Sequence, residues 1–309
     1  MIAAIDTIEA RELAERLARH EPLIVLDVRR PDAWCKDGVR IPGAVWIPHD
    51  KIARRVQDLP RERDLVVYCS CPGEATSTQA VRWLHDHGFP RAMRLAGGLR
   101  GWREAALATE TLAACGDAKA CSAVLPTLAE RHLRGGRPTR VVLATLFVDI
   151  AGSTRLLAHH PPETVLRWVQ RFMRFVTEIA LAYCGDVKDF EGDGVLLYFE
   201  SASEATEAAL ALRTAMAGHG SCDAACPIEA RMSVSVGEVV LGLVGTDLRH
   251  AIALVGSSVS VGARLLKQVW PGGIIATGEV IDALRDEMPA LAGSFRLTDP
   301  AFEVRWCPA

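Results

Sequence analysis

The stretch LFVDIAGST, residues 146–154, ends an apolar run with a carboxylate, Asp149. A second stretch, EGDG at residues 191–194, places Asp193 in a glycine-bounded turn between two further apolar runs. Two strands that end side by side would bring these carboxylates together. Carboxylate oxygens are the ligands that magnesium and manganese prefer, so the pattern predicts a metal-nucleotide site.

The residues that follow Asp149 predict a place for phosphate. Gly152, Ser153 and Thr154 open the next predicted helix. The free N–H groups and the positive dipole end of a helix start suit phosphate oxygens. We therefore expect the nucleotide's phosphates near this helix start.

Three further blocks follow in the same half of the chain: RMSVSVGEVVLGLVG at 231–245, VGSSVSVGARL at 255–265 and WPGGIIAT at 270–277. In this order, the five blocks resemble the class III nucleotidyl cyclases, the adenylate and guanylate cyclase family. The resemblance implies an α+β ferredoxin-like cyclase domain over residues 141–309. Since only one such domain is present and the family's sites form between two, it also implies a homodimer.

The resemblance implies a reaction. Two divalent ions, Mg or Mn, would be held by Asp149, Asp193 and the backbone carbonyl of Ile150, and would bind the triphosphate of ATP or GTP. The ribose 3′ hydroxyl would attack the α-phosphorus in line, and pyrophosphate would leave. The family's asparagine and arginine, four residues apart on one helix face, are here Ser260 and Arg264. Because a lost donor of this kind typically costs about a hundredfold in rate, we expect slow turnover.

The purine-reading positions depart from the family. Its lysine, four residues before the second metal aspartate, is replaced by Asp189, and Lys188 lies one residue earlier. Neighbouring strand residues face opposite sides, so Lys188 would reach the base only through a bulge or a local shift. The partner position is Ala253. We expect weak discrimination between ATP and GTP, with ATP favoured on family frequency alone.

The first third of the chain has its own set of blocks: LIVLDVRRPDAW at 23–34, VRIPGAVWIP at 39–48, LVVYCSCPGEATS at 65–77 and LAGGLRGW at 95–102. They resemble a rhodanese-like domain, which implies an α/β fold over residues 1–105. Cys69 lies between the apolar run Leu65–Tyr68 and a helix predicted from Thr76 to His87. Backbone N–H groups at a helix N-terminus lower a thiol pKa, so Cys69 is the candidate sulfur-accepting nucleophile.

The loop after Cys69 leaves two questions open. Residues 69–77 hold no Arg or Lys but do hold Glu74, so a persulfide-bearing protein or a small thiol is at least as good a donor as thiosulfate. Cys71 either resolves a persulfide or an oxidised Cys69, or is passive.

Composition fits two domains in 309 residues. The net charge of −3 and interspersed basic residues give no case for nucleic acid or an acidic membrane. Without a membrane-length apolar run or a signal peptide, we expect a cytoplasmic protein whose nine cysteines are thiols. Residues 106–140 are interpreted as a helical connector, with helices at 107–114 and 124–133 before a turn at 134–138.

Periodicity predicts the elements of the cyclase half: strands at 143–148, 186–190, 195–199, 228–236 and 239–242, and helices at 162–183, 203–217 and 257–269. Three functions remain open. The leading one is a nucleotidyl cyclase whose rhodanese domain senses sulfur or redox state. The second is a sulfurtransferase with a nucleotide-binding but catalytically weak cyclase half, and the third a regulatory protein with both sites silent.

Overall fold

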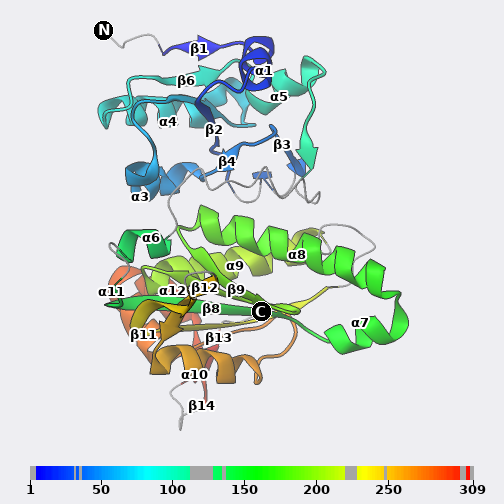
Figure 1. Ribbon diagram of the computed structural model, residues 1–309, viewed down its shortest axis with the longest axis vertical. Helices are drawn as coiled ribbons and strands as arrows, with labels where there is room; N and C mark the ends of the chain where they lie inside the picture. Colours follow the sequence, from blue (N-terminus) through cyan, green and yellow to red (C-terminus); the bar gives the residue numbers. More distant parts are fainter. Residues whose placement is uncertain are drawn as a thin grey trace. The chain divides into compact units, whose positions relative to one another are not determined.

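The computed structural model describes residues 5–30, 33–34, 37–111, 128–133, 137–219, 228–246, 249–299 and 304–306. The chain divides into two compact units, Met1–Leu125 and Pro126–Ala309 (Figure 1). Each unit has its own sheet and its own buried core. The division falls within the stretch 106–140 that we interpret as a connector.

The N-terminal unit is built on a parallel sheet in the order β1-β6-β5-β2-β4. Its strands are β1 (Thr7–Ile8), β2 (Leu23–Asp27), β4 (Val45–Trp46), β5 (Asp64–Tyr68) and β6 (Ala92–Leu95). Its helices include α1 (Ala10–Ala18), α3 (Ile52–Arg55), α4 (Ala75–Asp86) and α5 (Gly98–Glu104). Strand β5 lies at the centre of the sheet and ends directly before Cys69.

Both faces of this sheet are buried. Leu65 and Val67 of β5 pack in one apolar cluster with Leu84 of α4, whereas Val66 packs in a second cluster with Leu99 of α5. Successive residues of a strand face opposite sides, so a strand covered on both faces is a continuous apolar run. This explains why residues 65–67 of β5, LVV, are all apolar.

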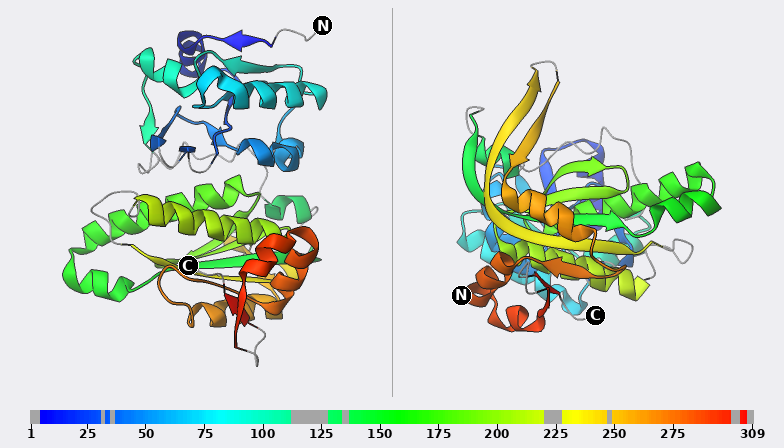
Figure 2. Two further views of the ribbon diagram at one scale, coloured as in Figure 1. Left: turned by 180° about the vertical axis from the view of Figure 1, so that it is seen from behind. Right: turned by 90° about the horizontal axis from the view of Figure 1, so that it is seen from below.

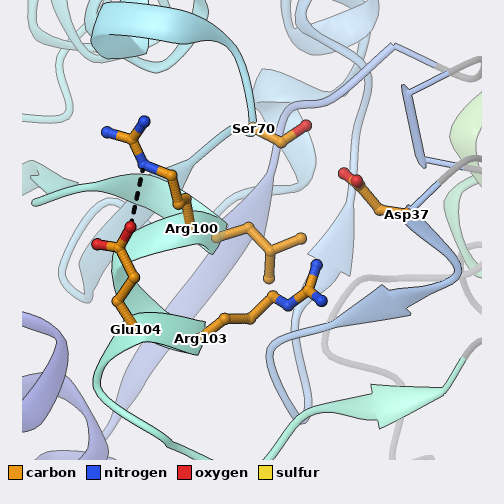
Figure 3. Close-up of a pocket in the computed structure, with 6 residues that line it drawn as sticks. Asp37, Ser70, Arg100, Arg103 and Glu104 are labelled. Atoms are coloured by element: carbon orange, nitrogen blue, oxygen red, sulfur yellow. Dashed lines mark ion pairs between the residues drawn. The ribbon is translucent and has the colours of Figure 1, made fainter.

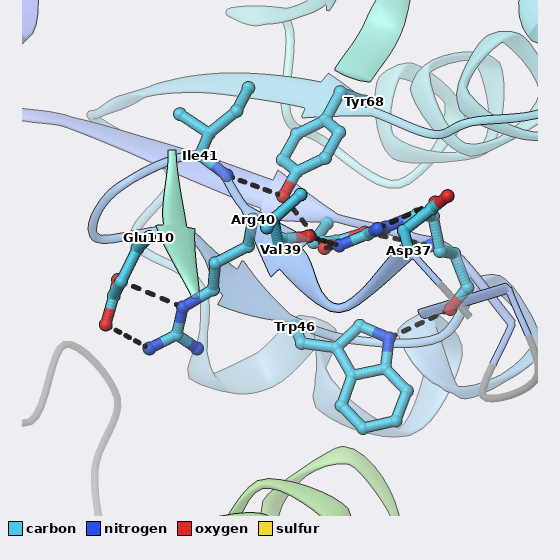
Figure 4. A network of polar contacts seen from close by, with 9 residues as sticks. Asp37, Val39, Arg40, Ile41, Trp46, Tyr68 and Glu110 are labelled. Carbon is cyan, nitrogen blue, oxygen red and sulfur yellow. Dashed lines mark hydrogen bonds and ion pairs between the residues drawn. The ribbon is translucent and has the colours of Figure 1, made fainter. Parts of the chain in front are cut away.

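A buried polar network fixes β5 to β2 (Figure 4). The Tyr68 hydroxyl donates to Asp27 at 2.8 Å and accepts from the N–H of Ile41 at 3.3 Å. Arg29 Nε donates to Asp27 at 2.8 Å. Burial raises the pKa of Tyr68 well above its ordinary value, and the charge of Asp27 adds to the shift. The network therefore holds a neutral Tyr68 immediately before Cys69.

The C-terminal unit has an eight-stranded sheet in the order β14-β15-β13-β11-β8-β10-β9, with β12 paired to β11. Its strands are β8 (Thr139–Ile150), β9 (Asp186–Glu191), β10 (Gly194–Phe199), β11 (Ala230–Thr246), β12 (Arg249–Val255), β13 (Ile274–Ala276), β14 (Arg296–Asp299) and β15 (Val304–Trp306). Helices α8 (Pro162–Ala182) and α9 (Ala202–His219) cover one face, and α10 (Ser257–Leu266) covers the other (Figures 1 and 2). The remaining helices are α6 (Leu128–His132), α7 (Ser153–His159), α11 (Gly278–Glu287) and α12 (Pro289–Ser294).

The predicted break between two strands at residues 237–238 is wrong, because β11 runs through it unbroken. Gly237 pairs with Leu143 of β8 within the ladder. A Cβ on Gly237 would lie 2.9 Å from the Cβ of Ser258, so the glycine is there for the close approach of α10. The second half of β11 forms with β12 a hairpin that extends beyond the sheet (Figure 2). The sequence analysis missed β12.

The described part of the predicted helix at 107–114 is not helical. Glu110–Thr111 forms strand β7, which pairs with β3 (Val39–Arg40). Arg40 Nε donates to Glu110 at 3.1 Å across this pair, so cross-strand contacts override local helix propensity. Residues 112–127 and 134–136 of the predicted connector lie outside the described residues, and Leu128–His132 forms helix α6. Within the described ranges, none of the helices has the length and apolar character needed to span a bilayer.

Candidate functional sites

The two aspartates of the predicted metal site meet at one edge of the C-terminal sheet. Asp149 lies next to the end of β8, and its ladder partner is Gly194, the first residue of β10. Asp193 precedes that glycine in the β9–β10 turn, where its carbonyl accepts from the N–H of Ile150 at 3.2 Å. Gly192, with a φ of 68°, provides the left-handed conformation of the turn. Strand pairing therefore brings the carboxylates together as predicted.

Arg231 is a member of this site that sequence reasoning missed. It lies opposite Asp149 in the β11–β8 ladder, and its Nη2 and Nε donate to Asp149 Oδ2 at 2.6 and 3.0 Å. Burial raises the pKa of Asp149 above its ordinary value; the Arg231 hydrogen bonds oppose this, and the charge of Asp193 adds to it. The signal was present as the arginine that opens RMSVSVGEVVLGLVG, but only the register places it beside Asp149.

The carboxylate pair suits a hard divalent ion. A half-buried Asp149 next to the negative charge of Asp193 is a position that a cation stabilises. The described residues contain no cluster of three or more His, Cys, Asp or Glu side chains that could hold a metal. The further ligand predicted from the sequence, the backbone carbonyl of Ile150, belongs to the residue that follows Asp149.

Helix α10 presents Ser260 and Arg264 to solvent. Buried hydroxyls fix the helix to the sheet: Ser233 Oγ donates to the Gly262 carbonyl at 2.8 Å, and Ser235 Oγ donates to the Ser258 carbonyl at 2.9 Å. Among the described residues, no hydrogen bond or ion pair joins Ser260 or Arg264 to the two aspartates. The structure therefore holds these predicted catalytic residues in place without contact to the carboxylates.

The second candidate site is the loop between β5 and α4. Cys69 is buried, and its carbonyl accepts from the N–H of Leu99 at 3.0 Å. Glu74 does not face the sulfur freely, because it accepts from the N–H of Gly97 at 2.7 Å and pairs with Arg94 at 3.0 Å. The negative charge that counted against an anionic donor is thus balanced within the domain.

Both sulfurs of the loop contact the first turn of α4, and Cys69 Sγ lies 3.4 Å from Ser77 Oγ. The N–H of Thr76, at the start of α4, donates to Cys71 Sγ at 3.4 Å. Burial raises the pKa of Cys69, and its contact with Cys71 adds to the shift, so the predicted lowering of that pKa is wrong. Burial also acts to raise the pKa of Cys71, but contacts with Cys69 and Thr76 outweigh it and lower the pKa.

A pocket of about 460 Å³ opens beside this loop (Figure 3). Its lining residues are Asp37, Ser70, Leu99, Arg100, Arg103 and Glu104. Arg100 pairs with Glu104 at 3.6 Å, and Asp37 accepts from Arg29 Nη1 at 2.9 Å. The two arginines of α5 supply positive charge that the loop itself lacks, a contribution that a search limited to residues 69–77 missed.

Comparison with known proteins identifies both units. The family model described as the adenylate and guanylate cyclase catalytic domain matches residues 139–299, more than half of the chain. The chain belongs to this family. A rhodanese-like domain model matches residues 9–105 of the same chain. The predicted fusion and the predicted fold class are therefore confirmed.

Two relatives match different parts of this chain. An uncharacterized protein of Mycobacterium tuberculosis is 31% identical over 163 residues, which cover 51% of this chain and 30% of the relative. A sulfurtransferase of Allochromatium vinosum is 35% identical over 98 residues, 32% of this chain and 88% of the relative. The chain thus spans only about 30% of the length of its mycobacterial relatives. The solved adenylyl cyclase CyaB from P. aeruginosa has 21% identity and a TM-score of 0.48, covering 56% of this chain and 96% of that one.

In the cyclase domain, the bulge that Lys188 would need is present. The β9–β10 ladder passes from Asp189 to Val187 and leaves Lys188 as the extra residue. Lys188 Nζ donates to Asp189 at 3.1 Å. The other base position, Ala253, lies in β12 and pairs with Gly242 of β11. Strands β10, β8 and β11 lie between β9, which carries Lys188, and β12. One chain therefore places the two base positions on separate strands.

The predicted phosphate segment of the cyclase domain opens a short helix. Gly152, with a φ of 73°, precedes α7, whose first residues are Ser153 and Thr154. The helix ends after seven residues. Ile150, directly before this segment, is buried at the end of β8. The residues predicted to bind phosphate and the predicted backbone ligand, Ile150, thus follow one another at the same strand end as Asp149.

Proposed function

We propose that this protein is a nucleotidyl cyclase that converts a purine nucleoside triphosphate, preferably ATP, to a 3′,5′-cyclic nucleotide and pyrophosphate. The observation that carries the proposal is the meeting of Asp149 and Asp193 at one sheet edge. Two close carboxylates suit divalent metal ions in a cyclase catalytic domain, and we assign them magnesium or manganese.

Each residue has a distinct role in the proposal. Asp149, Asp193 and the Ile150 carbonyl hold the metal ions, which when bound supply positive charge to the triphosphate. The N–H groups at residues 152–154 hold phosphate oxygens. Ser260 orients the ribose so that its 3′ oxygen bonds to the α-phosphorus as the bond to pyrophosphate breaks. Arg264 stabilises the charge that develops on the phosphoryl group.

We infer that two chains complete each active site. The base positions Lys188 and Ala253 lie on strands separated by three others, and Arg264 has no contact with the aspartates among the described residues. The hairpin of β11 and β12 carries exposed apolar side chains, of which Val244 is 55% and Val255 67% exposed. An exposed apolar hairpin suits contact with a second copy of the chain.

The rhodanese-like domain is proposed to accept sulfur at Cys69 and to act as a sulfur or redox sensor. A second candidate function, sulfur transfer with a regulatory cyclase half, is supported by the 35% identity to a sulfurtransferase. The arginines at positions 100 and 103 favour an anionic donor. The two candidates differ in whether nucleotide turnover occurs.

Incubation of the purified protein with ATP or GTP and manganese or magnesium, followed by chromatography of the products, separates these functions. The cyclase proposal expects cyclic nucleotide and pyrophosphate in equal amounts. With Asp189 and Ala253 at the base positions, the preference between ATP and GTP should stay below about a thousandfold, since a larger preference needs buried polar partners. Sulfur transfer without any cyclic product would support the second candidate.

A further inference from the structure

Cys69 and Cys71 form a close thiol pair. Their Sγ atoms are 2.9 Å apart, and both residues are free cysteines. We propose that Cys71 discharges a persulfide formed on Cys69, so that the loop ends as a Cys69–Cys71 disulfide and hydrosulfide is released. This inference rests on the proposed sulfur loading of Cys69 and adds to it the fate of the sulfur.

The surroundings of Cys71 make it the attacking thiolate. Its Sγ accepts from the N–H of Thr76 at 3.4 Å and lies 3.3 Å from Thr76 Oγ1. Thr76 is in the first turn of α4, a twelve-residue helix whose positive end stabilises an anionic sulfur. The lowered pKa of Cys71, in which the Cys69 and Thr76 contacts outweigh burial, agrees with this role. Cys71 is also more exposed than the buried Cys69.

The geometry selects the inner sulfur as the target. The inner sulfur of a persulfide is Cys69 Sγ itself, which already lies beside Cys71. The backbone of Cys69 is held by the N–H of Leu99, and a Cβ on Gly98 would lie 2.3 Å from the Cys69 carbonyl. Because the backbone at Gly98 and Leu99 packs so closely against Cys69, we expect Cys69 to stay within reach of Cys71 when a second sulfur is added.

The discharge is a single thiol exchange that conserves atoms and electrons. The Cys71 thiolate forms a bond to Cys69 Sγ, and the bond between that atom and the outer sulfur breaks. The outer sulfur leaves with the bonding electrons and the persulfide proton as hydrosulfide. An external dithiol then reduces the loop disulfide and is itself oxidised to a disulfide, which returns both cysteines to thiols.

The mass of one tryptic peptide reports the state of both cysteines. Trypsin cleaves after Arg63 and Arg82, and the peptide between these sites contains Cys69 and Cys71 and no other cysteine. The full-length protein is treated with polysulfide, desalted and followed for hydrosulfide release, then alkylated and digested. We expect about one hydrosulfide per chain and a wild-type peptide lighter by two hydrogens. Cys71→Ser should give a peptide heavier by one sulfur and release little hydrosulfide.

An aromatic disulfide, dithiobis(nitrobenzoate), tests the attack without a sulfur donor. In wild type, whichever of the two sulfurs the reagent modifies first, the other should expel the aromatic thiol and leave an internal Cys69–Cys71 disulfide in the peptide. Cys71→Ser and Cys71→Ala should keep the adduct, whereas Cys184→Ser, a change of another buried cysteine, should behave as wild type.

The polysulfide and aromatic-disulfide experiments distinguish a failure of the Cys71 discharge step from a failure of sulfur loading at Cys69. A stable persulfide or adduct on the wild-type peptide would overturn the role of Cys71 while leaving sulfur loading intact. An internal disulfide with the aromatic reagent, but no reaction with polysulfide, would instead refute the sulfur loading of Cys69 and with it the discharge step.

Discussion

The sulfur loop and the carboxylate site are built in opposite ways. In the loop, Cys69, Cys71 and Thr76 come from one turn between a strand and a helix, and each contacts the next. In the cyclase domain, the assigned groups are spread over β8, the β9–β10 turn, β12 and α10. The contacts of the loop lie within one turn of one chain, whereas among the described residues Arg264 has no hydrogen bond or ion pair with the two aspartates.

The largest expected effect tests the carboxylate half of this comparison. Asp193→Ala should lower cyclic nucleotide formation by at least about a hundredfold, because it removes one of the two groups that hold charge at the reacting phosphates. The fold should persist, since Asp193 is a half-buried turn residue whose backbone makes the Ile150 contact. Product chromatography and a thermal melt measure the two effects.

Glu191→Ala is the matched control, because Glu191 is an exposed acid two residues from Asp193. It should leave the rate close to wild type. Undiminished turnover in Asp193→Ala would rule out the assigned metal site.

The next effect asks whether the two halves communicate. Sulfur loading of Cys69, which should end as the Cys69–Cys71 disulfide in wild type and stay as a persulfide in Cys71→Ser, is expected to change the cyclase rate by about 5- to 150-fold, the range of an allosteric coupling of roughly 1 to 3 kcal/mol. The rate is measured before and after loading, with Cys69→Ser as the control. Equal rates and equal nucleotide affinities in all samples would show two independent domains.

Much of both sites could be predicted from sequence because the decisive signals are local. An apolar run ending in Asp149 and a glycine-bounded turn around Asp193 are contained in nine and four residues. Strand pairing alone then brought them together. The fold class followed from blocks whose order is visible along the chain.

The residues that were missed depend on contacts distant in sequence. Arg231 reaches Asp149 only through the register of β11 against β8, 82 positions along the chain. Gly237 resembles a strand break until the approach of Ser258 is known. The lowered pKa predicted for Cys69 was wrong because burial and the contact with Cys71 raise it, and neither can be read from the position of Cys69 before a helix.

A smaller effect tests whether the cyclase site needs two chains. Asp193→Ala and Arg264→Ala chains, each inactive alone, should regain activity when mixed and allowed to exchange. Half of the dimers are then mixed, and each holds one intact site of two, so about a quarter of wild-type activity is expected. Activity is measured beside native mass spectrometry, which counts mixed dimers. Mixed dimers without activity would place both residues in one chain's site.

The smallest expected effect concerns the order of the two thiols. Below the ordinary thiol pKa of about 8.5, iodoacetamide should modify Cys71 faster than Cys69, because the pKa of Cys71 is lowered and burial raises that of Cys69. The preference should shrink as the pH rises through the raised pKa of Cys69, where both sulfurs are ionised. Fragmentation of the peptide between Arg63 and Arg82 locates the modification.

Thr76→Val removes the hydroxyl contact with Cys71 but keeps the N–H donor. Since one hydrogen bond contributes about 1 kcal/mol, this variant should slow modification of Cys71 by about fivefold. Faster modification of Cys69 would instead place the thiolate where the sequence first predicted it, and the loop would then need an external thiol to release its sulfur.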